Sequence, residues 1–139
     1  MTIHETIPAM VQTYPLAPDG LPGPTGRSYW VVENRFAIRD VYIPTEELMV
    51  EILDAIDDDL AGGHNVYVHC WGGVGRTGTV VGCWLIRHGY AAADDVLEMI
   101  SDLRIGDAGR GPNAGPREAR VSPETLDQVD FVVGWEHGR

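Results

Sequence analysis

One short stretch of this sequence combines a nucleophile, a glycine-rich loop and a guanidinium. Cys70 and Arg76 are separated by five residues, three of which are glycines. A glycine-rich loop that leads into a helix lets backbone N–H groups converge on an anion, and the helix N-terminus adds its positive dipole end. A thiol at such a point has a lowered pKa, and an arginine fork matches two oxygens of a phosphate. The spacing therefore predicts nucleophilic chemistry on a phosphate group.

The residues around this loop extend the pattern. His69, Cys70, Arg76 and Thr77 match the signature of the cysteine-dependent protein tyrosine phosphatase superfamily, which is His-Cys, five residues, Arg, then Ser or Thr. From about Phe36 to the C-terminus the chain resembles the small dual-specificity branch of that superfamily. The resemblance implies that Cys70 forms a phosphocysteine that water hydrolyses, that Thr77 eases departure of the thiolate and that His69 orients the loop. The implied phosphate-binding residues are Trp71, Gly72, Gly73, Val74, Gly75 and Arg76.

The resemblance also implies a general acid. Asp40 precedes Cys70 by 30 residues and stands shortly before Pro44, as an aspartate does in dual-specificity members. Such a group is needed because the leaving oxygen must receive a proton as the P–O bond breaks. From the residues alone, a salt bridge with Arg39 or a turn cap is the other interpretation of Asp40.

Two nucleotide-binding motifs resemble the same loop. Residues 73–78 spell G-x-G-x-x-G, but the dinucleotide fingerprint requires a second strand ending in an acidic residue about 20 positions on, and residues 91–103 have a helical pattern. A Walker A loop requires lysine after its last glycine, where this chain has Thr79. Neither motif describes the loop.

Composition limits the possible partners. With 139 residues, 44% of them hydrophobic, the chain is expected to form one core. The net charge of −11 argues against nucleic acid or an anionic membrane as a partner. The cysteines and histidines lack paired ligand spacing, so we expect no metal and no cofactor. The sequence shows no signal peptide and no apolar run of membrane-spanning length, which together with a reactive thiol predicts a cytoplasmic protein.

The chain is expected to divide into an arm and one domain. Residues 1–27 carry five prolines and three glycines, which predicts an irregular Pro/Gly-rich N-terminal arm. Residues 28–139 are expected to form a single phosphatase-like catalytic domain. Its fold is predicted to be α/β, a short mixed or parallel central sheet flanked by helices as in dual-specificity phosphatases, with a reduced N-terminal part.

Local patterns place the elements of this fold. Strands are predicted at residues 28–32, 36–38 and 66–68, the last one buried. Four helices are expected. The first has Thr45 as N-cap, ends at Gly62-Gly63 and includes Leu60 on its buried face, and the second covers 77–88. The third covers 91–103 with Leu103 on its buried face, and the fourth opens with Ser122 as N-cap and Pro123 in its first turn.

Two features remain open from the sequence. Residues 104–121 are rich in glycine, proline and arginine, and contain Arg104, Arg110, Arg117 and Arg120 of the chain's ten basic residues. They form either a flap that meets a phosphate-bearing substrate or a solvated loop. Cys83 is either a redox partner of the nucleophile or a small buried residue.

Together these observations predict a phosphomonoesterase that acts through a phosphocysteine. Its expected partners are a phosphorylated protein or small phosphomonoester, with inorganic phosphate or a similar oxyanion in the loop. The alternative is a non-catalytic phosphopeptide-binding module of the same fold. Sulfur or arsenate chemistry is a third interpretation, for which the Asp40 segment has no obvious use.

Overall fold

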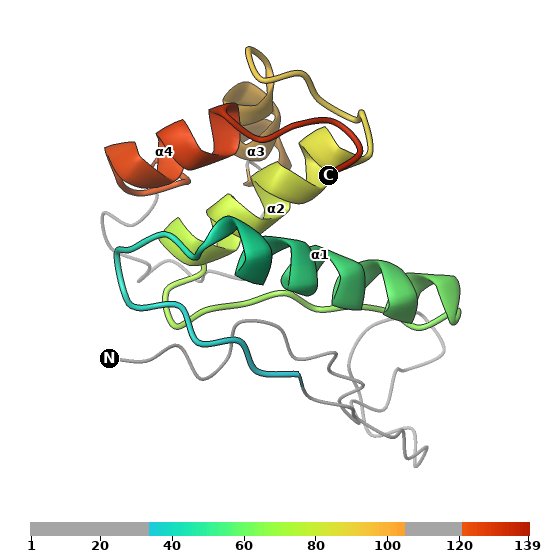
Figure 1. Cartoon of the computed structure of the whole chain (residues 1–139). Coiled ribbons are helices and arrows are strands. Elements are labelled where there is room, and N and C mark those ends of the chain that lie inside the picture. The colour runs from blue at the N-terminus through green and yellow to red at the C-terminus, as the bar shows by residue number, and fades with distance from the viewer. Residues whose placement is uncertain (1–33, 105–120) are drawn as a thin grey trace, which may run out of the picture.

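The computed structural model describes residues 34–104 and 121–139. The regular structure in these ranges consists of four helices, α1 (Glu46–Ala61), α2 (Gly75–Arg87), α3 (Val96–Arg104) and α4 (Leu126–Val133). Helix α2 lies in the middle, with α1 on one side and α3 and α4 on the other (Figure 1), and each of the other three helices packs against it. None of these helices is long and apolar enough to cross a membrane.

The predicted α/β fold with a central sheet is wrong for the described residues, which contain helices and no strand. Residues 66–68 do not form the predicted buried strand, and Tyr67 is 60% exposed. Residues 36–38 also form no strand, although Asn34 and Arg39 are isolated bridge residues. A strand exists only where its backbone pairs with a neighbour. The apolar residues of these segments indicated that one side is buried. Packing against helices can bury that side without a paired strand beside it.

Two further predictions concern the N-terminal part of the chain. The strand predicted at 28–32 and the arm predicted at 1–27 lie outside the described residues.

The apolar helix faces that were expected to cover a sheet instead pack against one another around α2.

Helix α1 begins as predicted. The Thr45 hydroxyl accepts a hydrogen bond from the Leu48 N–H at 3.2 Å, and Gly62 caps the other end, which confirms both predicted boundaries. Its buried face is formed by four apolar residues, Met49, Ile52, Leu53 and Ile56. Leu60, predicted on this face, is exposed because the last turn extends beyond the helices that cover the rest.

Helix α2 is the centre of the core. It begins at Gly75, two residues before the predicted start, and most of its residues are buried. Gly82 allows α4 to approach closely, because a Cβ at this position would lie only 2.6 Å from Cγ1 of Val132. The close packing of α4 on α2 places the segment before α4 against the loop that opens α2.

The last two helices begin later than predicted. Helix α3 starts at Val96 rather than at residue 91, and Leu103, predicted on its buried face, is 66% exposed. Helix α4 has Thr125 as its N-cap, not Ser122. The physical reason is that the Ser122 hydroxyl donates a 2.7 Å hydrogen bond to the Val74 carbonyl and so does not cap a helix.

Candidate active site

The loop between residue 70 and α2 is shaped to present backbone N–H groups. Gly73 has a φ of 65°, a left-handed conformation that glycine adopts without steric cost. Val74 is the N-cap of α2 and makes no side-chain hydrogen bond to the first turn. The N–H groups at this helix N-terminus are therefore available to a bound anion.

The Cys70 thiol lies against this loop. The residue is only 7% exposed, and the Gly73 N–H donates a hydrogen bond to Sγ at 3.2 Å. Burial acts to raise the pKa of Cys70. The Thr77 hydroxyl, the Thr77 and Gly73 N–H groups and the Arg76 charge all favour the thiolate and outweigh burial, so the pKa lies below its ordinary value. The surroundings therefore favour the thiolate, the reactive form of cysteine.

The Thr77 hydroxyl is close enough to the sulfur to contribute to that lowered pKa. Its oxygen is buried, and it completes no hydrogen bond of good geometry with any residue in the described ranges. A buried hydroxyl with this freedom can rotate to donate to a thiolate. The position fits the role that the sequence resemblance implies for Thr77.

Arg76 is buried beneath the loop, with 3% of the residue exposed. Its Nη1 donates to the Ile38 carbonyl at 3.4 Å, and its Nη2 lies 3.1 Å from Oδ1 of Asp40. A buried guanidinium requires such partners because an unpaired charge in the protein interior is costly. Arg76 thereby draws the 38–40 segment, distant in sequence, against the start of α2.

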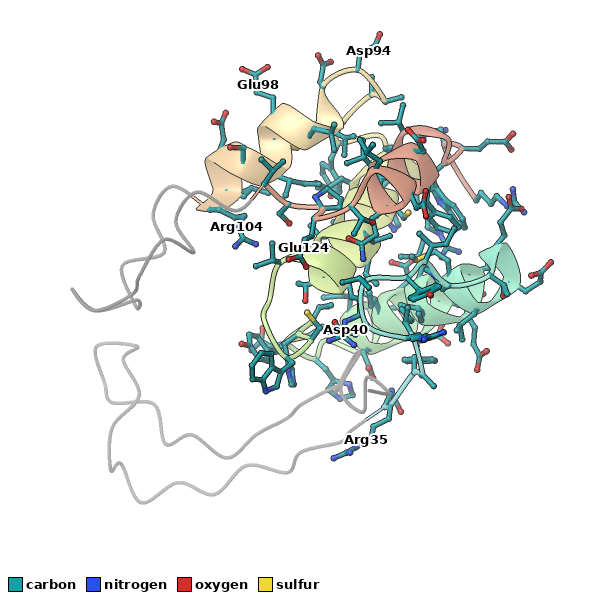
Figure 2. All side chains as sticks on the ribbon, turned by 90° about the vertical axis from the view of Figure 1, so that its left-hand side faces the viewer. Arg35, Asp40, Asp94, Glu98, Arg104 and Glu124 are labelled. Carbon is teal, nitrogen blue, oxygen red and sulfur yellow. The ribbon has the colours of Figure 1, made fainter. Side chains whose placement is uncertain are left out.

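Asp40 meets Arg76, and not Arg39, in the described structure. The Arg39 guanidinium lies over the Tyr42 ring, 4.4 Å from its centroid, while half of the Asp40 side chain is exposed. In Figure 2 Asp40 lies beneath α2. The salt bridge proposed from sequence between Asp40 and Arg39 is thus replaced by one to the buried arginine.

The backbone beside Asp40 is strained. Val41 has a φ of 61°, which is rare for a β-branched residue and costs roughly 1–3 kcal/mol. The conformation is held by the Tyr42 N–H, which donates to the Arg39 carbonyl at 3.1 Å, and by Gln128, whose Nε2 donates to the Tyr42 carbonyl at 3.3 Å. Strain maintained by its surroundings is typical of functional sites.

The proposed catalytic residues Cys70, Arg76 and Asp40 line one pocket of about 120 Å³. Cys70, Arg76 and Asp40 come together there, although the sequence separates Asp40 from the other two. Four of the predicted loop residues also line the pocket, namely Trp71, Gly72, Val74 and Gly75. Gly73 does not line it, and its contribution is the N–H that meets the thiol.

Three lining residues were not predicted as site residues, namely Val41, Glu124 and Gln128. Gln128 is fully buried, and a Cβ at Gly75 would lie 2.8 Å from its Oε1 and 3.1 Å from Oε2 of Glu124. Thr125 and Gln128 form a capping box, and this pattern of Thr with Gln three residues later was a readable sequence signal. It would have located the helix, but not the pocket that the helix borders.

The remaining predicted residues lie around the pocket. His69 has its Nδ1 3.4 Å from the Cys70 carbonyl oxygen and stacks on Tyr67, with ring centroids 5.2 Å apart. Trp71 is 75% exposed at the rim of the loop. Cys83 is buried in the core and not in the pocket, and burial raises the pKa of its thiol.

The described ranges contain no group of three or more histidine, cysteine or acidic residues placed to hold a metal ion. Of the four arginines in the 104–121 segment, the structure describes Arg104, whose Nη1 donates to the Gly73 carbonyl at 2.7 Å. Arg110, Arg117 and Arg120 lie outside the described residues.

Comparison with known proteins finds similarity to phosphatases. A family model described as "Polymorphic toxin system, DSP-PTPase phosphatase" matches residues 26–90. That range includes Asp40, Cys70 and Arg76. No solved structure matches the chain significantly.

Three curated relatives show the extent of the similarity. The chain is 36% identical over 63 residues to the tyrosine-protein phosphatase cdc-14 of Caenorhabditis elegans, a match that covers 45% of this chain and 8% of that protein. It is 42% identical over 62 residues to the dual specificity protein phosphatase CDC14B of Mus musculus, covering 45% and 12%. It is 49% identical over 96 residues to an uncharacterized protein of Methanocaldococcus jannaschii, covering 69% and 54%. The matches span about half or less of each relative.

Proposed function

Because the chain belongs to the cysteine-dependent protein tyrosine phosphatase superfamily, we propose that it hydrolyses phosphate monoesters through a phosphocysteine intermediate on Cys70. The observation that carries this proposal is the meeting of the Cys70 thiol, the Arg76 guanidinium and the Asp40 carboxyl in one pocket. A nucleophile, an oxyanion clamp and a proton donor are the three groups that phosphoryl transfer to cysteine requires.

In the first step the Cys70 thiolate attacks phosphorus, and the bond from phosphorus to the ester oxygen breaks. The phosphoryl oxygens are bound by Arg76 and by the N–H groups at the start of α2. The lowered pKa of Cys70 supports this step, because it increases the fraction of the nucleophile that is present as thiolate at a given pH.

Asp40 donates the proton that the leaving oxygen needs. Arg76 and Asp40 are paired at 3.1 Å, so a phosphate dianion entering the pocket competes with the Asp40 carboxylate for the guanidinium. Binding of phosphate would release the Asp40 side chain from Arg76. Substrate binding would then free the proposed acid from its ion pair at the point where the leaving oxygen needs it.

In the second step water attacks the phosphocysteine, releases inorganic phosphate and regenerates the Cys70 thiolate, with Asp40 accepting the proton from the water. The Thr77 hydroxyl stabilises the departing thiolate, and His69 holds the Cys70 carbonyl side of the loop. No metal or organic cofactor takes part in the proposed reaction.

The proposed substrates are phosphorylated proteins and small phosphomonoesters. Two of the residues that line the pocket, Trp71 and Val41, are apolar and exposed, which suits an aromatic phosphate ester. A thiol that must stay reduced suits the cytoplasm, which we propose as the location of the protein.

The test is hydrolysis of p-nitrophenyl phosphate with and without a chelator. We expect chelator-independent turnover that Cys70→Ser abolishes, because a serine hydroxyl is a far weaker nucleophile in the same cradle. Phosphate-analogue binding should survive in Cys70→Ser, and Cys83→Ser is the matched control. Substantial activity in Cys70→Ser would exclude the covalent mechanism. If the wild-type protein binds a phosphopeptide tightly but hydrolyses no phosphate ester, a non-catalytic binding module would be favoured.

A further inference from the structure

The outer side of the anion-binding loop is held by two side chains from outside it. Arg104, the last residue of α3, donates to the Gly73 carbonyl at 2.7 Å. Ser122 donates to the next carbonyl, that of Val74, also at 2.7 Å. Figure 2 shows Arg104 at the end of α3, on the same side of the molecule as Glu124. The mechanism proposed above uses neither residue.

Each of the two contacts holds a carbonyl and thereby orients the N–H group of the same peptide, which points the opposite way. In a planar trans peptide the C=O and the N–H of the next residue point in opposite directions. A Gly73 carbonyl held by Arg104 therefore turns the Val74 N–H toward the pocket, and a Val74 carbonyl held by Ser122 turns the Gly75 N–H the same way. Val74 and Gly75 line the pocket, whereas Gly73 does not.

The contact made by Arg104 is the less replaceable of the two. The Val74 carbonyl also accepts the Gly78 N–H at 3.1 Å, so the first turn of α2 already sets its direction. The Gly73 carbonyl has only Arg104 as its hydrogen-bond partner within the described residues. Gly73 also has a left-handed φ, and a glycine permits its peptide plane to rotate at little cost.

We propose that Arg104 is a positioning residue that fixes the Gly73–Val74 peptide so that the Val74 N–H faces the bound phosphoryl group, with Ser122 in a supporting role. This inference rests on the proposed function, because it takes phosphate as the anion. Arg104 does not line the pocket and acts through the backbone, whereas Arg76 lines the pocket itself.

The experiment compares Arg104→Met with wild type by calorimetric binding of tungstate, a tetrahedral oxyanion. Tungstate binding needs no turnover. Losing one oriented N–H to a charged ligand should weaken binding about tenfold. Arg87→Met is the matched control, because Arg87 lies at the other end of α2 and pairs with Asp54 and Asp57. It should bind tungstate as wild type does. Ser122→Ala should weaken binding by less than Arg104→Met.

Salt separates positioning from simple charge. An effect of the Arg104 charge acting at a distance is largely screened at 1 M salt, where the Debye length is about 3 Å. The loss caused by a misoriented peptide persists, so the ratio of wild-type to Arg104→Met affinity should be similar at 0.15 and 1 M salt. Arg104→Gln, with a side chain too short to reach Gly73, provides a second variant if the apolar one does not fold.

Wild-type affinity in Arg104→Met, or a loss that disappears at 1 M salt, would overturn the inference. So would a wild-type protein that does not bind tungstate. A wild-type protein that binds tungstate but hydrolyses no phosphate ester would instead contradict the proposed function and leave the comparison of variants readable. The two failures are therefore distinct.

Discussion

The two cysteines of the chain are both buried, but their surroundings differ in polarity. Cys70 accepts the Gly73 N–H and lies beside Thr77 and Arg76, and these neighbours lower its pKa despite burial. Cys83 lies among apolar side chains, and burial alone raises its pKa. The same residue type is thus prepared for nucleophilic chemistry at one position and kept as a neutral thiol at the other.

This difference predicts selective alkylation. Iodoacetamide should modify Cys70 and leave Cys83 unmodified in the folded protein, as measured by peptide mass mapping. The rate at Cys70 should rise with pH around a midpoint that lies below the ordinary thiol value, because the folded-state pKa is lowered. The stability that this ionisation contributes is present above the unfolded pKa and is lost as pH falls through the folded pKa. A rate that still rises steeply above pH 9 would contradict the assignment.

Asp40 faces Arg76, and this contact predicts opposite effects on turnover and on binding. Asp40→Asn should lower kcat for phosphotyrosine by about 10²–10⁴-fold, and much less for aryl phosphates whose leaving group needs no proton. Tungstate should bind to Asp40→Asn at least as tightly as to wild type, because the carboxylate no longer competes for Arg76. Glu47→Gln, in the exposed first turn of α1, is the control. Equal kcat losses for both substrates would show that Asp40 is not the acid.

At the scale of elements, α2 connects the core to the pocket. Its first turn carries Arg76 and Thr77, and its middle packs closely against α4 through Gly82 and Val132. Helix α4 in turn carries Gln128, which holds the Tyr42 carbonyl and lines the pocket. The position of the Asp40 segment relative to Cys70 therefore depends on how closely these two helices pack.

A methyl group at Gly82 should separate the two helices. The new Cβ would lie 2.6 Å from Cγ1 of the fully buried Val132, and overpacking of this kind costs about 1–3 kcal/mol. Alanine has the better helix propensity by about 1 kcal/mol, which offsets part of this cost. We therefore expect Gly82→Ala to lower the free energy of unfolding by up to about 2 kcal/mol in urea denaturation.

Gly72→Ala is the control for this measurement. A Cβ at Gly72 would have nothing within 4 Å, and its φ is not in the left-handed region. Its stability should therefore be close to that of wild type. If Gly82→Ala were as stable as Gly72→Ala, the close approach of α4 to α2 would not contribute to the packing as described.

At the scale of the whole molecule, the pocket that we propose binds an anion belongs to a chain with a net charge of −11. The loop itself contributes no charged residue between Cys70 and Arg76, and two acidic side chains, Asp40 and Glu124, border the pocket. Surrounding charge acts over roughly 8–10 Å at physiological salt. The loop is suited to one phosphate group, and additional phosphates on a substrate should be repelled.

We therefore expect a phosphotyrosine peptide to have a higher kcat/KM than a bisphosphorylated inositol lipid. Raising the salt concentration should narrow the difference, because screening reduces repulsion of the more highly charged substrate. The measurement is kcat/KM for both substrates at two salt concentrations. A preference for the lipid at both concentrations would contradict the prediction and would point to the arginines of the 104–121 segment as a local basic rim.

The sequence by itself identified the loop and the chemistry it suggests, because residues 69–77 are contiguous and their geometry is local. A glycine-rich turn followed by a helix presents its N–H groups whatever surrounds it. The start and end of α1 were predictable for the same reason, since Thr45 and Gly62 act within one turn of the helix.

Only the tertiary structure decided which distant residues meet the loop. Asp40 could be assigned a proton-donor role only by resemblance, and its pairing with the buried Arg76 rather than with Arg39 follows from packing. The contacts of Arg104 with Gly73, Ser122 with Val74 and Gln128 with Tyr42 join positions 31, 48 and 86 residues apart. The predicted sheet failed for the same physical reason. A short apolar segment indicates burial, but only its long-range neighbours decide whether the burying surface is a strand or a helix.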